Sequence, residues 1–175
     1  MKNIYILFLL LTSTFISAQS FPHSWVGDYS GNLEIYAVDS ILMNVKMDLN
    51  VQPTETDSIF SWVITYKMEG RDADIRKYEL HIKDKSKGLY VIDEKNGIII
   101  ESYLKSDILT SCFTVMESFI IATYTKVKDE IVFEIISGKT DPVSVTGETK
   151  VEDEDIPRVE TFPINGRQKA ILSKK

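Results

Sequence analysis

Few side chains in this sequence have the types and spacing that catalysis or metal binding requires. The only histidines are His23 and His81, and the only cysteine is Cys112. His81 alternates with Glu79 and Lys83 along one strand face, which predicts a side chain that points to solvent. Metal sites need clustered ligands, and no serine lies in a GxSxG motif. We therefore expect no metal, no cofactor and no catalytic residue, although a haem on one axial histidine and an enzyme with scattered residues stay open.

The remaining reactive candidates also lack partners in the sequence. Cys112 alternates with Thr110 and Thr114 and has no adjacent cation, which predicts a small buried residue rather than a reactive thiolate. Asp93 and Glu94 are neighbours in an extended segment, so their carboxylates point to opposite faces. They cannot easily work as an acid and base pair.

Aromatic residues and one arginine at alternating positions suggest a ligand chamber instead. Arg76 is in phase with Tyr78 and Leu80, and a buried cation needs a carboxylate, either from the protein or from a ligand. An apolar chamber with tyrosine hydroxyls and one arginine suits an acidic lipid or an aromatic acid. The alternative is an interior filled by its own side chains. The predicted lining residues are Trp62, Tyr66, Arg76, Tyr78 and Tyr90.

These side chains belong to segments that alternate apolar and polar residues with a period of two. The segment MNVKMDLNV, residues 43–51, places Met43, Val45, Met47, Leu49 and Val51 on one face, which is typical of a half-buried strand. Residues 60–68 and 76–83 follow the same rule. The segment 88–104 predicts a hairpin in which Gly97 has positive φ, Ile92 faces Ile100 and Tyr90 faces Ser102.

About ten such strands follow one another with short connections, and no segment has a convincing helical period. This order predicts an all-β fold: a single up-and-down antiparallel barrel of about 8–10 strands, because closure removes exposed strand edges. Residues 137–158 interrupt the alternation with a long acidic stretch. We interpret it as a solvated surface loop, with a lid over the barrel mouth as the alternative.

Residues 1–18 have the features of a secretory signal peptide: Lys2, a short apolar core and small residues before Ala18. We expect cleavage after Ala18, export to the periplasm or outside the cell, and no membrane span in the mature chain. Cleavage would change the formal charge from −6 to −7, because the segment holds one lysine and no acid. A single cysteine excludes an internal disulfide. The excess of acidic residues disfavours nucleic acid and anionic membranes as partners.

The stretch SWVGDYSG, residues 24–31, resembles the start of lipocalin-like (calycin) barrels, in which a glycine and a tryptophan lie close together on the first strand. The resemblance implies that Trp25 closes the narrow end of the barrel, that Gly27 lets the strand bend, and that a cation of the last strand covers the indole. Arg167 is the expected cation, with Lys169 as the alternative. Here the tryptophan precedes the glycine, so the usual order is reversed.

Segments along nearly the whole chain from Trp25 onward are also similar to a group of exported bacterial proteins of unassigned function. That resemblance implies the barrel and export and carries over no site residue. Our leading hypothesis is capture of a small hydrophobic or amphipathic molecule in the barrel. The alternative is a non-catalytic interaction module of the cell envelope with a filled barrel, for which Ile99 and Tyr103, beside Val91, would form an apolar patch.

Overall fold

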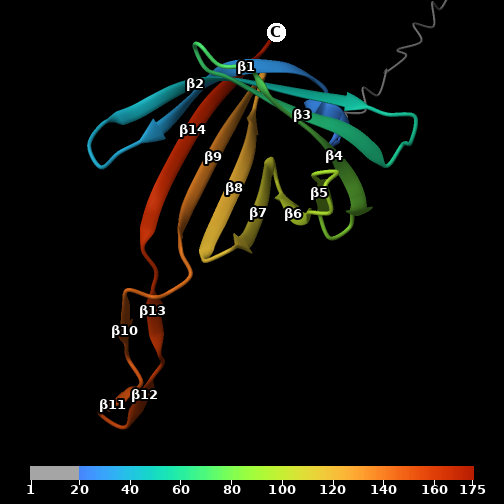
Figure 1. Ribbon diagram of the computed structural model, residues 1–175. Helices are drawn as coiled ribbons and strands as arrows, with labels where there is room; N and C mark the ends of the chain where they lie inside the picture. Colours follow the sequence, from blue (N-terminus) through green and yellow to red (C-terminus); the bar gives the residue numbers. More distant parts are fainter. Residues whose placement is uncertain (1–19) are drawn as a thin grey trace, which may run out of the picture.

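Ten antiparallel strands close into a barrel in the computed structural model, which describes residues 20–175 (Figure 1). Each strand pairs with the next one in the chain, and the last strand closes the barrel between β9 and β1. The prediction of an up-and-down, lipocalin-like barrel is therefore confirmed. The barrel strands are β1 (Gly27–Tyr36), β2 (Ile41–Pro53), β3 (Ile59–Lys67), β4 (Asp74–Asp84), β5 (Leu89–Asp93), β6 (Ile99–Lys105), β7 (Ile108–Val115), β8 (Ser118–Val127), β9 (Glu130–Lys139) and β14 (Ile164–Lys174).

The period-two pattern of the sequence becomes an inner and an outer face of the barrel wall. On β2, Val45, Met47, Leu49 and Val51 are buried and the residues between them are not. The β5–β6 hairpin has the predicted register, in which Ile92 pairs with Ile100 and Tyr90 with Ser102. Its turn contains Gly97 at φ 97° and also Lys95 at φ 61°, both in the left-handed region.

One end of the barrel is closed by a short 3₁₀ helix, η1 (His23–Trp25), that precedes β1. Trp25 is 1% exposed and packs edge-on against Phe21 with 4.7 Å between the ring centroids. The indole therefore lies in the core at this end, as the resemblance implies, but it comes before the first strand rather than on it.

The cations at the closed end lie over Tyr29 and not over the tryptophan. Lys126 Nζ is 4.5 Å and Lys174 Nζ 6.0 Å from the centroid of the Tyr29 ring. The Tyr29 hydroxyl accepts a hydrogen bond from Lys126 Nζ at 2.9 Å and donates one to the carbonyl oxygen of Trp25 at 2.9 Å. A last-strand cation does contribute, but it is Lys174.

The expectation that Arg167 covers Trp25 is wrong. Arg167 lies near the start of β14, where the neighbouring Gln168 pairs with Ile35, so it is at the opposite end of β1 from Trp25. Its side chain projects from the outer face, 5.8 Å from the ring of Tyr36 and in an ion pair with Glu134 at 3.3 Å. Lys169 shares the Glu134 carboxylate at 3.5 Å.

Two glycines of β1 fit the tight path of that strand. Gly27 has φ 153°, which other residues rarely adopt, and a Cβ there would lie 2.6 Å from Lys174 Cε. A Cβ on Gly31 would lie 2.1 Å from the backbone oxygen of Ile171, so β1 and β14 approach closely there. The close approach of β1 to β14 thus leaves no room for a side chain at Gly31.

At the other end of the barrel, part of the wall has no backbone pairing. Residues 74–78 of β4 pair only with β3, because β5 reaches no further than the pair Glu79–Asp93. Residues 111–115 of β7 pair only with β8, since the β6–β7 ladder covers only 103–105 and 108–110. We call this unpaired stretch between β4 and β7 the wall gap; the turn 94–98 of the short β5–β6 hairpin lies at it.

The acidic stretch is not a structureless loop. Residues 140–163, here named the arm, form two small two-stranded sheets that extend away from the open end of the barrel (Figure 1). Residues 137–139 belong to β9 itself. The arm strands are β10 (Ser144–Thr146), β11 (Thr149–Val151), β12 (Glu154–Ile156) and β13 (Val159–Thr161).

Two further sequence expectations bear on the fold. Cys112 is exposed, not buried, because Leu109 and Ser111 occupy the inner face of β7 and the alternation turns Cys112 outward. The expected signal peptide, residues 1–18, and its cleavage site lie outside the described residues. Among residues 20–175, no helix is long and apolar enough to cross a membrane.

Candidate functional site

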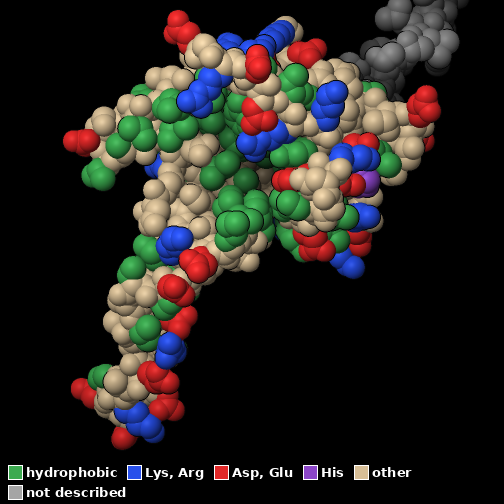
Figure 2. Space-filling model, viewed as in Figure 1, with side chains coloured by type: hydrophobic (Ala, Val, Ile, Leu, Met, Phe, Trp, Pro, Cys, Tyr) green, Lys and Arg blue, Asp and Glu red, His purple; other side chains and the backbone are tan. Residues whose placement is uncertain are grey.

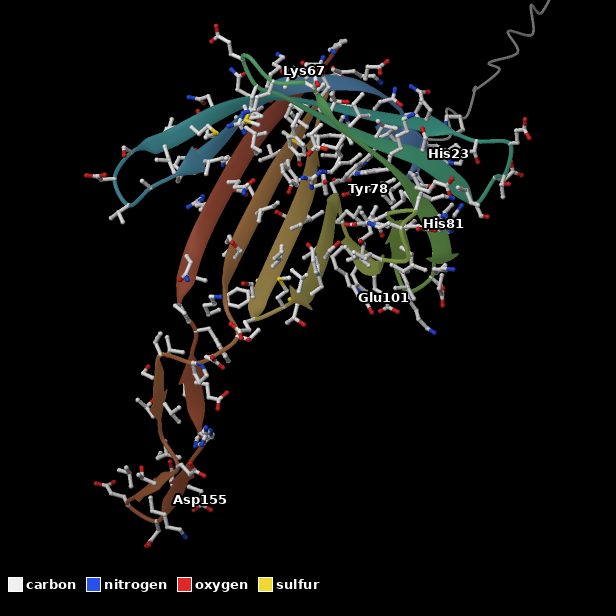
Figure 3. The ribbon with its side chains drawn as sticks, in the orientation of Figure 1. His23, Lys67, Tyr78, His81, Glu101 and Asp155 are labelled. Carbon is white, nitrogen blue, oxygen red and sulfur yellow. The ribbon has the colours of Figure 1, made fainter. Side chains whose placement is uncertain are left out.

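The inner face of β3 and β4 brings three of the five predicted lining residues together near the open end. The Arg76 guanidinium carbon lies 5.0 Å from the centroid of the Tyr66 ring. Tyr78 is the next inward residue on β4 and is half-buried; Figure 3 labels it inside the barrel. We call Tyr66, Arg76 and Tyr78, with Asp74, the mouth cluster.

Arg76 is not a buried cation, but it has a carboxylate partner in Asp74. Its Oδ2 accepts hydrogen bonds from Arg76 Nε at 3.2 Å and Arg76 Nη2 at 3.1 Å. The side chains of Arg76 and Asp74 are 47% and 53% exposed, so the pair lies at the rim rather than deep in the core. The sequence contained a signal for this pair, because Asp74 is two residues before Arg76 and therefore on the same strand face.

The phenols around this cluster stay neutral at physiological pH. Burial raises the pKa of Tyr66, while the Arg76 charge acts in the opposite direction. Burial and the Glu94 charge raise the pKa of Tyr78, and Arg76 again opposes them. The pKa of Tyr124, which is buried beyond them, is raised far above its ordinary value by burial. These hydroxyls can therefore donate hydrogen bonds to an acceptor on a ligand.

The other two predicted lining residues are part of the core. Trp62 is 1% exposed and packs edge-on against Tyr124 at 5.1 Å, and Tyr90 is 3% exposed and packs against Phe21 at 4.7 Å. The closed half of the barrel is thus filled by side chains. Period-two alternation assigned both residues to the inner face correctly but carried no information on depth.

Half-buried apolar side chains continue the inner face around the open half. Figure 2 shows hydrophobic side chains gathered in the hollowed middle of the view, between β14, β9 and β8 on one side and the β4–β6 strands on the other. Ser102 and Ser111 add a buried hydrogen bond, 2.6 Å between their hydroxyl oxygens, across the β6–β7 seam. The half-buried residues toward the open end that pack on the core are Ile35, Tyr66, Met68, Tyr78, Ile100 and Ile135, while Val26, Ile82 and Leu104 do so at the closed end.

Two hollows lie outside this inner face. The first, about 930 Å³, is lined by outward residues of β1 and β14, including Glu34, Tyr36 and Arg167. The second, about 670 Å³, lies at the base of the arm, where Phe162 packs against Phe119 with 6.4 Å between the ring centroids. Both are open to solvent, and neither contains a residue of the mouth cluster.

The outward patch proposed for a partner protein is interrupted. Ile99 and Tyr103 are 65% and 44% exposed, but Val91 is 5% exposed and contributes little surface. Glu101 lies between Ile99 and Tyr103 on the same face and accepts a hydrogen bond from the Tyr103 hydroxyl at 2.7 Å. Scattered apolar residues of this kind do not make a continuous docking surface.

Comparisons with known proteins agree with the barrel and do not give a family. No protein-family model and no curated protein matches the chain. Among solved structures, an S-type phycobiliprotein lyase from Guillardia theta is similar, with a TM-score of 0.53 and 7% sequence identity over 86% of this chain and 88% of that one. At that identity the likeness shows the fold alone. The class defined by the strands and their closure is a lipocalin-like β-barrel.

Proposed function

We propose that this protein binds a small amphipathic molecule in the open half of its barrel, with an acidic group of the ligand at Arg76. The observation that carries the proposal is the mouth cluster: a half-exposed guanidinium and two neutral phenols beside an apolar inner face. Small-molecule sites in proteins combine such apolar walls with a few placed polar groups. The wall gap supplies an entrance.

The state of Arg76 supports an anionic ligand group. A guanidinium carries five N–H donors, and Asp74 engages only two nitrogen atoms through one of its oxygens. Tyr78 also accepts a hydrogen bond from this guanidinium, and the donors left over can bind a carboxylate of a ligand. Capture by an exported carrier would also fit the expected signal peptide, which makes export part of the proposal.

A fluorescence titration with a dansyl-labelled fatty acid and its methyl ester tests this assignment. We expect saturable binding of the acid and a loss of at least about tenfold in affinity for Arg76→Gln, because a hydrogen bond to a charged group contributes roughly 1.5–3 kcal/mol. Binding of the ester should change little. Biliverdin, an open-chain tetrapyrrole acid, is a suitable second probe because the structural neighbour is a phycobiliprotein lyase.

Arg167→Gln is the matched control for that titration. Arg167 is also about half exposed and paired with one carboxylate, but it lies on the outer face. An equal loss of affinity in both variants, or unchanged binding of the acid to Arg76→Gln, would contradict the role of Arg76. Absence of binding by both the acid and the ester would contradict the ligand site itself.

The second candidate function is a non-catalytic interaction module, and the arm is the observation that favours it. The arm extends into solvent and exposes Val143, Val145, Val151 and Val159, which are 45–65% exposed. Two-stranded ribbons are only marginally stable alone, so a partner that covers the arm would stabilise it. A pull-down that compares the full chain with an arm-deleted chain discriminates the two functions, because ligand binding at the mouth cluster does not need the arm.

A further inference from the structure

Three potential metal ligands converge on the outer face of the barrel, away from the mouth cluster. Glu79 and His81 are two residues apart on β4, and Asp93 pairs directly with Glu79 from β5. One ligand atom of each lies within 4.8 Å of the other two, and all three residues are half-buried. Figure 3 labels His81 on the flank of the barrel opposite the arm.

The strand register brings these groups together without any loop. Residues i and i+2 of a strand share a face, and directly paired residues on neighbouring antiparallel strands have Cβ atoms about 4.5–5.5 Å apart. The same register places two carboxylates opposite each other, which is unfavourable unless a cation lies between them. Val91, which pairs with His81 on β5, is buried and gives the site an apolar border.

A cation already occupies part of this position. Lys95 Nζ lies 3.1 Å from Glu79 Oε2, and His81 Nε2 lies 3.0 Å from the same oxygen. The Lys95 backbone N–H donates to Asp93 Oδ1 at 2.7 Å, and its φ of 61° belongs to the turn that returns the chain over this face. The lysine side chain is half exposed and flexible, so a metal ion can displace it.

We propose that Glu79, His81 and Asp93 form a binding site for a divalent transition-metal ion such as Zn²⁺. One imidazole nitrogen with two carboxylates is a donor set that suits Zn²⁺, Ni²⁺ or Cu²⁺ better than Mg²⁺ or Ca²⁺. Zinc–ligand bonds of about 2.0–2.2 Å require ligand atoms roughly 3.3 Å apart, so small side-chain rotations suffice. The fourth position faces solvent and would hold water.

The test is calorimetric titration of untagged, chelator-treated protein with Zn²⁺, supported by Co²⁺ absorption spectra. We expect 1:1 binding, a Co²⁺ spectrum of tetrahedral intensity, and a loss of affinity of at least about tenfold in both His81→Ala and Glu79→Gln. Lys95→Ala should strengthen binding about twofold to fivefold, because it removes a competing surface ion pair. Circular dichroism of each variant checks that the barrel remains folded.

His23→Ala and Lys87→Ala are the matched controls. His23 is the other histidine of the chain and lies in η1, and Lys87 pairs with Asp84 in the β4–β5 turn at 3.3 Å. Neither change should alter the affinity. Failure of the wild-type protein to bind Zn²⁺ at 1:1 stoichiometry, or an equal loss in His23→Ala and His81→Ala, would overturn the proposal.

Discussion

Asp48 is the residue at which several separate parts of the chain meet. Its carboxylate oxygens lie 2.8 Å from Lys67 Nζ on β3 and 3.0 Å from Lys175 Nζ at the C-terminus, and its side chain is only 18% exposed. Burial by itself would raise the pKa of Asp48, but hydrogen bonds from Lys67, Ser30 and Lys175 outweigh it and hold the pKa far below its usual value. The charged form is therefore favoured in the folded state.

We expect Asp48→Asn to lower the free energy of unfolding by roughly 1 kcal/mol at neutral pH. A depressed folded-state pKa stabilises the protein at pH values above the unfolded value of 3.8, and this contribution is lost as the pH falls below it. The difference between wild type and variant should therefore shrink in urea unfolding curves recorded from pH 7 down to about pH 3.

Glu117→Gln is the control for this pH series. Glu117 is 84% exposed and lies 3.9 Å from Lys139, so its replacement should leave the unfolding free energy nearly unchanged at every pH. A destabilisation by Asp48→Asn that stays constant down to the lowest pH would show that the charge of Asp48 is not its cause.

At the residue scale, the sequence predicted which face of a strand a side chain occupies better than its depth or its partner. Tyr66, Arg76 and Tyr78 do meet on the inner face, because alternation is enough to place them there. Trp62 and Tyr90 share that face but are deep in the core, and depth depends on strand stagger around the barrel. The cation at the closed end could not be chosen by type alone, since the last strand offers both Arg167 and Lys174.

At the element scale, the close approach of β1 to β14 leaves no space for a side chain at position 31. We expect Gly31→Ala to destabilise the barrel by about 1–3 kcal/mol, because the new methyl group would meet the Ile171 carbonyl oxygen on the neighbouring backbone. Thermal and urea unfolding followed by circular dichroism measure the effect.

Gly70→Ala provides the comparison for that variant. Gly70 has φ 72° and open space around its Cα, so an alanine there costs only backbone strain of roughly 1 kcal/mol. If Gly31→Ala were no more destabilising than Gly70→Ala, the close strand approach would not be the reason for a glycine in β1.

The strands themselves were largely predictable, and the exceptions have physical causes. The β5–β6 register followed from the need to keep Ile92 and Ile100 on one buried face. The short helix η1 was missed because three residues are too few to produce a helical period. A strand was expected at residues 159–164, where β13 lies, but β10, β11 and β12 were missed because they have three residues each and no buried face, so apolar alternation gives no signal for them.

For the whole molecule, the arm and the barrel are expected to be energetically independent. Replacement of residues 140–163 by Asn-Gly should leave the barrel folded and lower its unfolding free energy by no more than about 1 kcal/mol, because the aromatic contact of the arm with the barrel is Phe162 on Phe119. Unfolding curves of the full and shortened chains measure this difference.

Limited trypsin digestion is a second test of whether the barrel stays folded without an intact arm. Lys150 and Arg158 lie on the arm and are more than half exposed, so early cleavage there should leave the barrel intact. Loss of barrel structure after cleavage, or in the shortened chain, would show that the arm is needed for folding.

Closure of the sheet was predictable for the molecule as a whole, because hairpins that follow one another along the chain leave two free edges that can pair. The net charge of the sequence did not indicate where the acidic residues would lie in the fold. Seven of the 26 are in the arm. Export stays a prediction from residues 1–18.

The wall gap has a consequence for kinetics. A guest that passes between residues 74–78 and 111–115 breaks no backbone ladder hydrogen bond, because no ladder joins these segments. Its arrival and departure are then limited by rotation of side chains and of the turn 94–98, on a timescale much shorter than that of strand separation. Residence time in this barrel should therefore be unrelated to the slow amide-exchange rates of its sheet.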